Sequence, residues 1–202
     1  PKFADMLNAK NIELPMIMGS IYLLLVFVMG VDAAKSRPPS PAEMAEIHRL
    51  IDEAMDAGAL GISMSCMGAE GNSHLDCDGT PMPTDTLDHD TVLDICRALT
   101  ERGEGVIQLL SHLVVYGNRS LTERVLELAR GSGVTVIHNA CMTSDIFPGK
   151  VEEDLAWLEG QRAKGLDLIV NVLVNRGWIE AGMRQLDVAC GMLTAVRRIA
   201  AC

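Results

Sequence analysis

The sequence predicts an α/β fold in which helices and strands alternate around a parallel sheet, forming part of a (β/α)8 TIM-type barrel. Helix-like and strand-like segments alternate along the chain, and the later strands recur about every 30 residues. The candidate strands 134–137 and 166–174 are apolar without alternation, which is typical of strands covered on both faces. Because a complete barrel takes about 250 residues, the 202 residues are expected to form a single domain, 1–202, that is a large piece of one.

Two phosphate-binding versions of this architecture lose support, because neither GxGxxG after the first strand nor GxxxxGK[ST] is present. The net charge of −10 opposes binding to a phosphate backbone, so no nucleic-acid partner is expected. The six cysteines form no CxxC pair and fit reduced thiols, which indicates a cytoplasmic location.

The segment 15–31 carries no charge and leaves two alternatives open. It is either a buried strand or core segment, or a membrane span, which usually takes about 20 apolar residues. Glycine and serine interrupt the run, and Glu13 and Asp32 flank it where a membrane span prefers Lys or Arg. We therefore expect a buried strand or core segment and no membrane attachment.

The first clear helix begins after the linker 35–41. Ser40 is a good N-cap, Pro41 suits the first helical position, and Glu43 completes a capping box. Apolar residues at helical spacing follow as far as Gly58. A further helix is expected at 87–102, with Asp88 as its cap and Gly103 as its stop. Others are expected at 120–131, 151–164 and 178–201, and further strands at 59–65, 105–110, 134–137 and 166–174. Ser120 and Glu123 predict a second capping box.

Chemistry in parallel α/β folds is located at the carboxyl ends of the strands. Ser63 and Ser65 end one strand, and Asn139 follows another, so these side chains are candidate substrate-binding groups. His74 joins them because it lies in a long loop, 67–85, that follows the first of these strand ends and is placed to cover the site. Within that loop Asp78-Gly79 predicts a turn.

His112 and His138 follow neighbouring strands and are the candidate metal ligands, because neutral imidazole is a common zinc ligand. The alternative is that both side chains are only solvated or hydrogen-bonded in loops. No HxH, HExxH or clustered Cys/His motif accompanies them. No catalytic residue can be assigned from the sequence.

Three phrases resemble one family. The stretch 40–65, with EAMDAGALGIS at its centre, resembles a helix–strand unit of the D-aminoacylase-like amidohydrolases, the N-acyl-D-amino-acid deacylase group. The loop HLDCDGTPMP, 74–83, resembles a loop with a histidine and a DG-x-P-x-P element in one branch of that group. The ending Val28-Met29-Gly30 is similar as well.

The resemblance implies a barrel hydrolase in which zinc activates water to attack the C–N amide bond of a small N-acylated, D-amino-acid-like substrate. The family's first pair of metal-binding histidines would lie upstream of Pro1, and its catalytic aspartate downstream of Cys202. The family histidines would fall at Leu110 and near Ala140 or Cys141, so that His112 comes two residues late and His138 about two residues early.

The family's metal set is therefore not carried over to this chain, and we expect no hydrolysis from it. The alternative interpretation is a non-catalytic α/β fragment or an oligomerising module that lacks a complete metal site. A barrel cut after about five strands has two unpaired edges, which favours a homo-oligomer.

Overall fold

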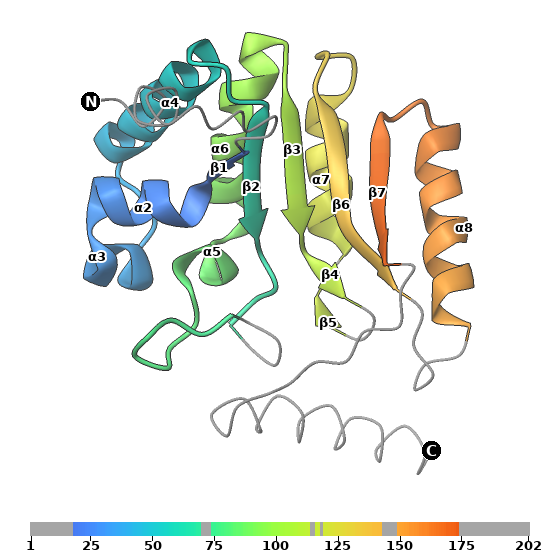
Figure 1. The fold of residues 1–202 in the computed structure, drawn as a ribbon, viewed down its shortest axis with the longest axis horizontal. Helices are drawn as coiled ribbons and strands as arrows, with labels where there is room; N and C mark the ends of the chain where they lie inside the picture. Colours follow the sequence, from blue (N-terminus) through green and yellow to red (C-terminus); the bar gives the residue numbers. More distant parts are fainter. Residues whose placement is uncertain (1–17, 70–73, 114–115, 118, 143–148, 174–202) are drawn as a thin grey trace, which may run out of the picture.

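The computed structural model describes residues 18–69, 74–113, 116–117, 119–142 and 149–173. Strands and helices alternate along the chain, which confirms the predicted α/β class (Figure 1). The elements are β1 (Met18–Ser20), α2 (Ile21–Met29), α3 (Val31–Ser36), α4 (Pro41–Asp56), β2 (Gly61–Ser65), α5 (Pro83–Thr86), α6 (His89–Arg102), β3 (Val106–Leu110), β4 (His112–Leu113), β5 (Tyr116–Gly117), α7 (Arg119–Ala129), β6 (Thr135–Met142), α8 (Lys150–Ala163) and β7 (Leu168–Leu173).

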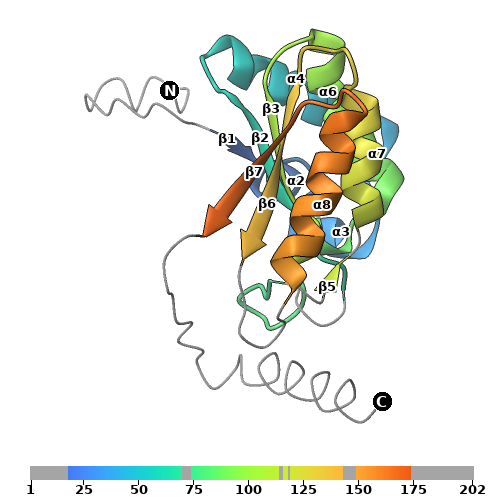
Figure 2. The same cartoon turned by 90° about the vertical axis from the view of Figure 1, so that its right-hand side faces the viewer.

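The strands of the main sheet are parallel and lie in the order β1-β2-β3-β6-β7, which is their order along the chain. The short β4 and β5 form a separate antiparallel pair. Helices α4, α6, α7 and α8 all lie on one side of the main sheet (Figure 2). The strand order explains the single helix layer. Each helix connects one strand to the next strand of the sheet, and because all such crossovers are right-handed, every helix lies on the same face.

Burial alternates along the strands. Toward the helices, β2, β3, β6 and β7 bury apolar side chains such as Ile62, Ile107 and Val136, whereas Ile137 is half-buried and Ile169 is 51% exposed on the other face. The expectation that both faces are covered is therefore wrong for the described residues, in which helices cover one face. Each fully buried Ile or Leu contributes about 1.5–3 kcal/mol to folding, so most of the core stability comes from the helix-facing side.

The capping residues correctly predicted where two helices begin. Ser40 caps α4, and both hydrogen bonds of its capping box with Glu43 are present. Arg37 pairs with Glu43 and lowers the pKa of that carboxyl to about 2. Asp88 caps α6 by accepting a hydrogen bond from the backbone N–H of Thr91. The second expected capping box is wrong, because α7 begins at Arg119 and Ser120 lies within its first turn.

The apolar segment 15–31 is mostly helical. Among its described residues, 18–31, Met18–Ser20 pair as a strand and α2 follows at once. Ile21 and Leu25 lie one helical turn apart and are fully buried, while Leu23 and Phe27 on the opposite side are exposed. The expected strand is thus wrong for residues 21–29, whereas the alternative of a core segment fits, because Ile21 and Leu25 belong to the hydrophobic core. Across the described residues no helix combines the length and the apolar character that a membrane crossing needs. The helix expected at 178–201 lies outside the described residues.

A test of the β2–β3 pairing comes from Gly61. A Cβ atom at this position would lie 1.9 Å from the carbonyl oxygen of Val106 on the neighbouring strand. We expect Gly61→Ala to separate these strands and to lower the free energy of unfolding by about 3 kcal/mol or more. Gly160→Ala is the matched control, because a Cβ there, in the middle of α8, meets nothing within 4 Å. It should raise stability by about 0.5–1 kcal/mol. Urea denaturation of both variants measures this, and equal stability for the two would contradict the pairing.

Candidate functional site

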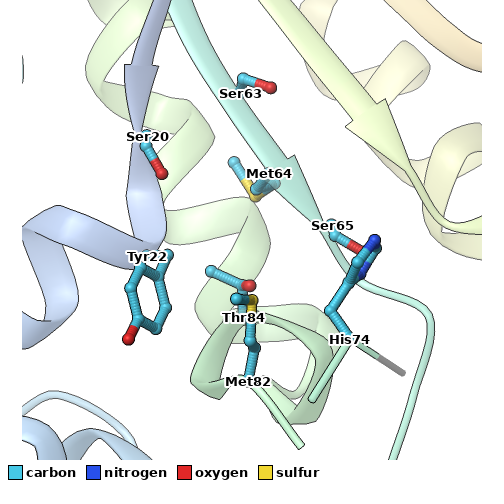
Figure 3. Close-up of a pocket in the computed structure, with 8 residues that line it drawn as sticks. All are labelled: Ser20, Tyr22, Ser63, Met64, Ser65, His74, Met82 and Thr84. Atoms are coloured by element: carbon cyan, nitrogen blue, oxygen red, sulfur yellow. The ribbon is translucent and has the colours of Figure 1, made fainter. Parts of the chain in front are cut away.

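A pocket of about 190 Å³ opens at the carboxyl ends of β1 and β2, next to the loop that joins β2 to α5. Five of its eight lining residues carry a hydroxyl group. Figure 3 shows Tyr22 on one side, Thr84 and Met82 below, and His74 beside Ser65 on the other side. The residues that line the pocket are Ser20, Tyr22, Ser63, Met64, Ser65, His74, Met82 and Thr84. Binding pockets for drug-sized molecules usually hold about 300–1,000 Å³, so this one suits a smaller group.

The carboxylate of Asp85 anchors one wall of this pocket. Its side chain is fully buried behind His74 and accepts four hydrogen bonds. Ser65 donates its hydroxyl to Oδ1 at 2.6 Å, and the backbone N–H of Met67 donates to Oδ1 at 2.9 Å. His74 donates its backbone N–H to Oδ2 at 2.6 Å, and its ring Nδ1 lies 3.2 Å from the same oxygen. One carboxylate thus joins the end of β2, the start of the loop and the imidazole.

The contacts of His74 assign the proton on its ring. Nδ1 lies 3.2 Å from Asp85 Oδ2 and 3.2 Å from Ser65 Oγ. The carboxylate oxygen can only accept, and the hydroxyl proton of Ser65 is already donated to Asp85. Nδ1 is therefore the protonated nitrogen, and Nε2 is the ring atom left to exchange a proton or to meet a ligand.

His74 and Asp85 each stabilise the charged form of the other. The hydrogen bond to Asp85 raises the pKa of His74, and burial of the ring opposes this only in part. Burial alone would raise the pKa of Asp85, but the hydrogen bonds from His74, Met67 and Ser65 lower it overall. Around neutral pH the carboxyl is ionised, and the imidazole is charged over a wider pH range than a free one.

The rest of the loop is held by a turn and by a lysine. Gly79 adopts a left-handed φ of 81°, and Asp78 accepts hydrogen bonds from the backbone and side chain of Thr80, which confirms the predicted turn. Lys35 of α3 lies 2.8 Å from both Asp76 and Asp78. An ammonium group thus occupies the position that a cation bound by these two carboxylates would take.

Three of the four predicted substrate-binding residues meet in one place. Ser63, Ser65 and His74 all line the pocket. Ser63 donates to Gln108 Oε1 on the neighbouring strand at 3.3 Å. Asn139 lies on the same face of the sheet, but on β6, two strands away, where Asn171 donates a hydrogen bond to its side-chain oxygen. The structure therefore does not bring Asn139 into the pocket.

The candidate metal ligands are placed differently. His138 is buried on the helix-covered face, and its ring packs edge-on against Trp157 of α8, with ring centres 5.4 Å apart. His112 begins the short strand β4, and its side chain lies outside the described residues. Among the described residues no group of three or more His, Cys, Asp or Glu side chains is arranged to hold a metal. The position of His138 argues against a zinc shared with His112, and the pair stays a prediction.

Cysteine nucleophiles are not favoured at this edge of the sheet. The thiol of Cys66 follows β2 directly and is almost fully buried, which raises its pKa well above the ordinary value. Burial also raises the pKa of Cys141 on β6. Since the thiolate is the nucleophilic form, the thiols of Cys66 and Cys141 are poor nucleophiles at neutral pH. The described cysteines, Cys66, Cys77, Cys96 and Cys141, are all free thiols.

Sequence reasoning missed Asp85, Ser20 and Tyr22. The sequence marks Asp85 only as the end of the loop, whereas in the structure its buried carboxylate holds Ser65, Met67 and His74 in place behind the pocket. The signal in the sequence is Pro83 followed at once by acidic and hydroxyl residues, which is typical of a first helical turn. Ser20 and Tyr22 were hidden inside an apolar run whose strand-to-helix junction has no marker in the sequence.

A scan against protein-family models, a search of curated proteins and a search of solved structures each found no match to this chain.

The anchoring role of Asp85 gives a stability prediction. Asp85→Ala leaves the backbone N–H groups of Met67 and His74 without their acceptor, at about 1–3 kcal/mol for each buried group. We expect the free energy of unfolding to fall by at least about 2 kcal/mol. Asp78→Ala in the same loop is the control, because Asp78 is half exposed and its ion pair is worth about 0–1 kcal/mol. Equal losses in urea denaturation would show that Asp85 is no anchor.

The pKa shifts of His74 and Asp85 also predict how the stability of the fold depends on pH. His74 has a raised folded pKa, so its contribution is complete below the unfolded value of about 6.5 and is lost as the pH rises through the folded value. Asp85 has a lowered folded pKa, so its contribution is complete above about 3.9 and is lost as the pH falls through the folded value. The pair should stabilise the fold most between about pH 4 and 6.5.

The measurement compares the free energy of unfolding of the natural chain and of His74→Gln from pH 5 to 9. The difference should shrink at high pH, whereas His89→Gln, a histidine outside the pocket, should show no such trend. A difference that is constant over this range would contradict the pairing of His74 with Asp85.

Proposed function

We propose that this chain is part of a barrel hydrolase of the D-aminoacylase-like type, acting on the C–N amide bond of a small N-acylated amino acid. In this proposal the described residues supply substrate-binding side chains rather than the metal centre. The observation that carries it is the pocket itself. Ser63, Ser65 and His74, chosen from the sequence as substrate-binding groups, line one cavity at the carboxyl ends of the strands.

The strand order supports a barrel. Doubly wound sheets reverse their strand order and so carry helices on both faces. Here the order follows the chain and α4, α6, α7 and α8 lie on one side (Figure 2). In a (β/α)8 barrel the helices form an outer ring and the opposite face of the sheet lines the interior. The five parallel strands would make up more than half of the eight in such a barrel.

The face of the sheet opposite the helices carries polar side chains near the carboxyl ends of the strands, which suits the interior of such a barrel. Ser63 and Gln108 are hydrogen-bonded side by side on β2 and β3. Asn139 and Asn171 are paired in the same way on β6 and β7. Hydroxyl and amide groups of this kind fix the orientation of an amide substrate, because they can donate to its carbonyl and accept from its N–H.

Zinc does not fit the described residues. His138 is turned to the helix layer against Trp157, where a metal bound at the carboxyl edge of the sheet would not reach its ring. A zinc site takes three or four protein ligands, and the described residues bring no such group together. The proposal therefore assigns no step to a metal held by these residues.

A second candidate is a non-catalytic oligomerising module. It is favoured by β7, which pairs only with β6 among the described residues and exposes Ile169. The side of α2 that faces away from the core also exposes Leu23 and Phe27. An unpaired strand edge and exposed apolar side chains favour association of copies.

The test is a titration of the purified chain with N-acetyl-D-methionine, followed by NMR, with and without added zinc. We expect saturable shifts at the pocket residues and no release of free amino acid above the metal-free control. Ser63→Ala should weaken binding about fivefold, because a neutral hydrogen bond contributes about 1 kcal/mol. Ser36→Ala, an exposed serine outside the pocket, is the control.

Three outcomes would overturn this proposal in different parts. Absence of binding, together with a stable dimer in light scattering, would favour the oligomerising module. Binding that Ser63→Ala leaves unchanged would place the substrate elsewhere. Zinc-dependent hydrolysis that a chelator and His138→Ala both abolish would show that the chain assembles its metal centre through His138 after all.

A further inference from the structure

The pocket has one feature that its hydroxyl groups do not explain. Among its lining residues, His74 is the one side chain able to carry a positive charge near neutral pH, and no carboxylate belongs to the lining. The nearest carboxylate, Asp85, is fully buried and saturated by four hydrogen bonds. A ligand in the pocket therefore meets an imidazole and several hydroxyl donors, and not a negative charge.

We propose that His74, oriented by Asp85, binds the carboxylate of a small ligand in this pocket through Nε2–H of its protonated ring. As a binding mode for the substrate, this inference rests on the proposed function, because an N-acylated amino acid carries one free carboxylate beside its amide bond. Asp85 is a positioning residue, since it touches His74 and not the ligand.

Geometry fixes which ring atom is used. Nδ1 faces Asp85 Oδ2 and Ser65 Oγ, both at 3.2 Å, and both accept its proton. A second proton can therefore only go to Nε2, which becomes a charged donor. The side chain of His74 is 51% exposed, so a ligand can reach the ring while its Asp85 side stays buried. A charge-assisted hydrogen bond from such a donor is about twice as strong as a neutral one.

The other charged groups near the pocket do not compete for the ligand. On the α2 side, Tyr22 donates to Asp76 at 3.5 Å, and Lys35 of α3 neutralises Asp76 and Asp78 at 2.8 Å each. On the β2 side the lining residues, Ser63, Met64 and Ser65, are uncharged. From α5, Asp85 alone faces the ring with a charge. A cationic ligand finds no free carboxylate here, which is why the carboxylate is favoured as the bound group.

The size of the pocket agrees with this ligand class. About 190 Å³ accommodates a carboxylate with a short chain, but is below the usual range for larger cofactors. The hydroxyl groups of Ser20 and Thr84 can donate to the second carboxylate oxygen or to an acyl carbonyl, and the hydroxyl oxygen of Ser63, whose proton goes to Gln108, can accept from an amide N–H.

The experiment measures binding of acetate, N-acetyl-D-methionine and N-acetyl-D-methioninamide by NMR titration from pH 5 to 9, following the ring signals of His74. We expect both carboxylates to bind below the pKa of His74 and to raise that pKa on binding. The dissociation constant should increase about tenfold per pH unit above it, because one proton is taken up with the ligand. The amide should bind at least about tenfold more weakly than its acid.

Two variants separate the roles of the pair. His74→Gln should weaken carboxylate binding at least about tenfold at pH 6 and remove its pH dependence, whereas His89→Gln should change neither. Asp85→Asn should shift the loss of affinity to lower pH while leaving binding at pH 5 within a few-fold of the natural chain, which a merely structural role would not do. If Asp85→Asn does not fold, His74→Gln and the pH dependence still decide the question.

Carboxylate binding that is unchanged in His74→Gln, or that is constant between pH 6 and 9, would overturn the inference. It would leave the proposed function intact if N-acetyl-D-methionine still binds. The converse result is equally clear. If acetate and N-acetyl-D-methionine bind equally well through His74, the inference stands and the preference for N-acylated amino acids fails.

Discussion

The buried carboxylate of Asp85 is the interaction on which the pocket depends. A charge removed from water is costly unless hydrogen bonds replace its hydration. Four donors do so here, and they come from the end of β2, from the first residues of the loop and from His74. Because these donors lie 11 to 20 residues before Asp85, satisfying one charge holds the described loop residues 66–69 and 74–84 against the end of β2. The same contacts set the proton on Nδ1 and leave Nε2 as the ring nitrogen without a partner among these groups, on a side chain that is half exposed and lines the pocket.

The sheet supplies the platform beneath this loop. Parallel strands that follow the chain order place every carboxyl end at one edge and every crossover helix on one face. The helix-facing side carries the core, so it tolerates little besides close-packed apolar groups. The opposite side is free to hold polar groups, and Ser63, Gln108, Asn139 and Asn171 lie there. Stability and binding are thus divided between the two faces of the same strands.

Much of this fold could be predicted from local signals. The capping box of Ser40 and Glu43 marked the start of α4 to the residue, and Gly103 marked the end of α6, where its φ of 82° suits glycine. Ser63 and Ser65 lie at the carboxyl edge of the sheet, as expected for residues at a strand end, and the loop brings His74 beside Ser65; their role in binding a substrate stays a prediction. These predictions needed no knowledge of which strands are neighbours.

Other features depend on contacts that no local pattern contains. The run 15–31 satisfies both a buried strand and a helix, and tertiary packing of Ile21 and Leu25 decides for α2. Asp85 becomes special only through partners 11 to 20 residues away. Hydrogen bonds over such distances follow from the path of the loop, which the sequence does not specify by itself.

The orientation of His138 on β6 is a further feature that cannot be predicted from the sequence alone. Counting residues along β6 predicts that His138 and a position two residues later face the same way, because side chains alternate with a period of two. His138 faces the helices, paired in register with Val170, while Asn139 faces the open side with Asn171. The register then shifts between Asn139 and Cys141, so that Cys141 pairs with Val172 and is buried. An extra residue of this kind re-aims the chain beyond it. When residues are counted across this shift, the side chain at the counted position faces the opposite side of the sheet from the one expected. His138, two residues from the place of the family's histidine, therefore cannot be assumed to reach the position of the family's metal.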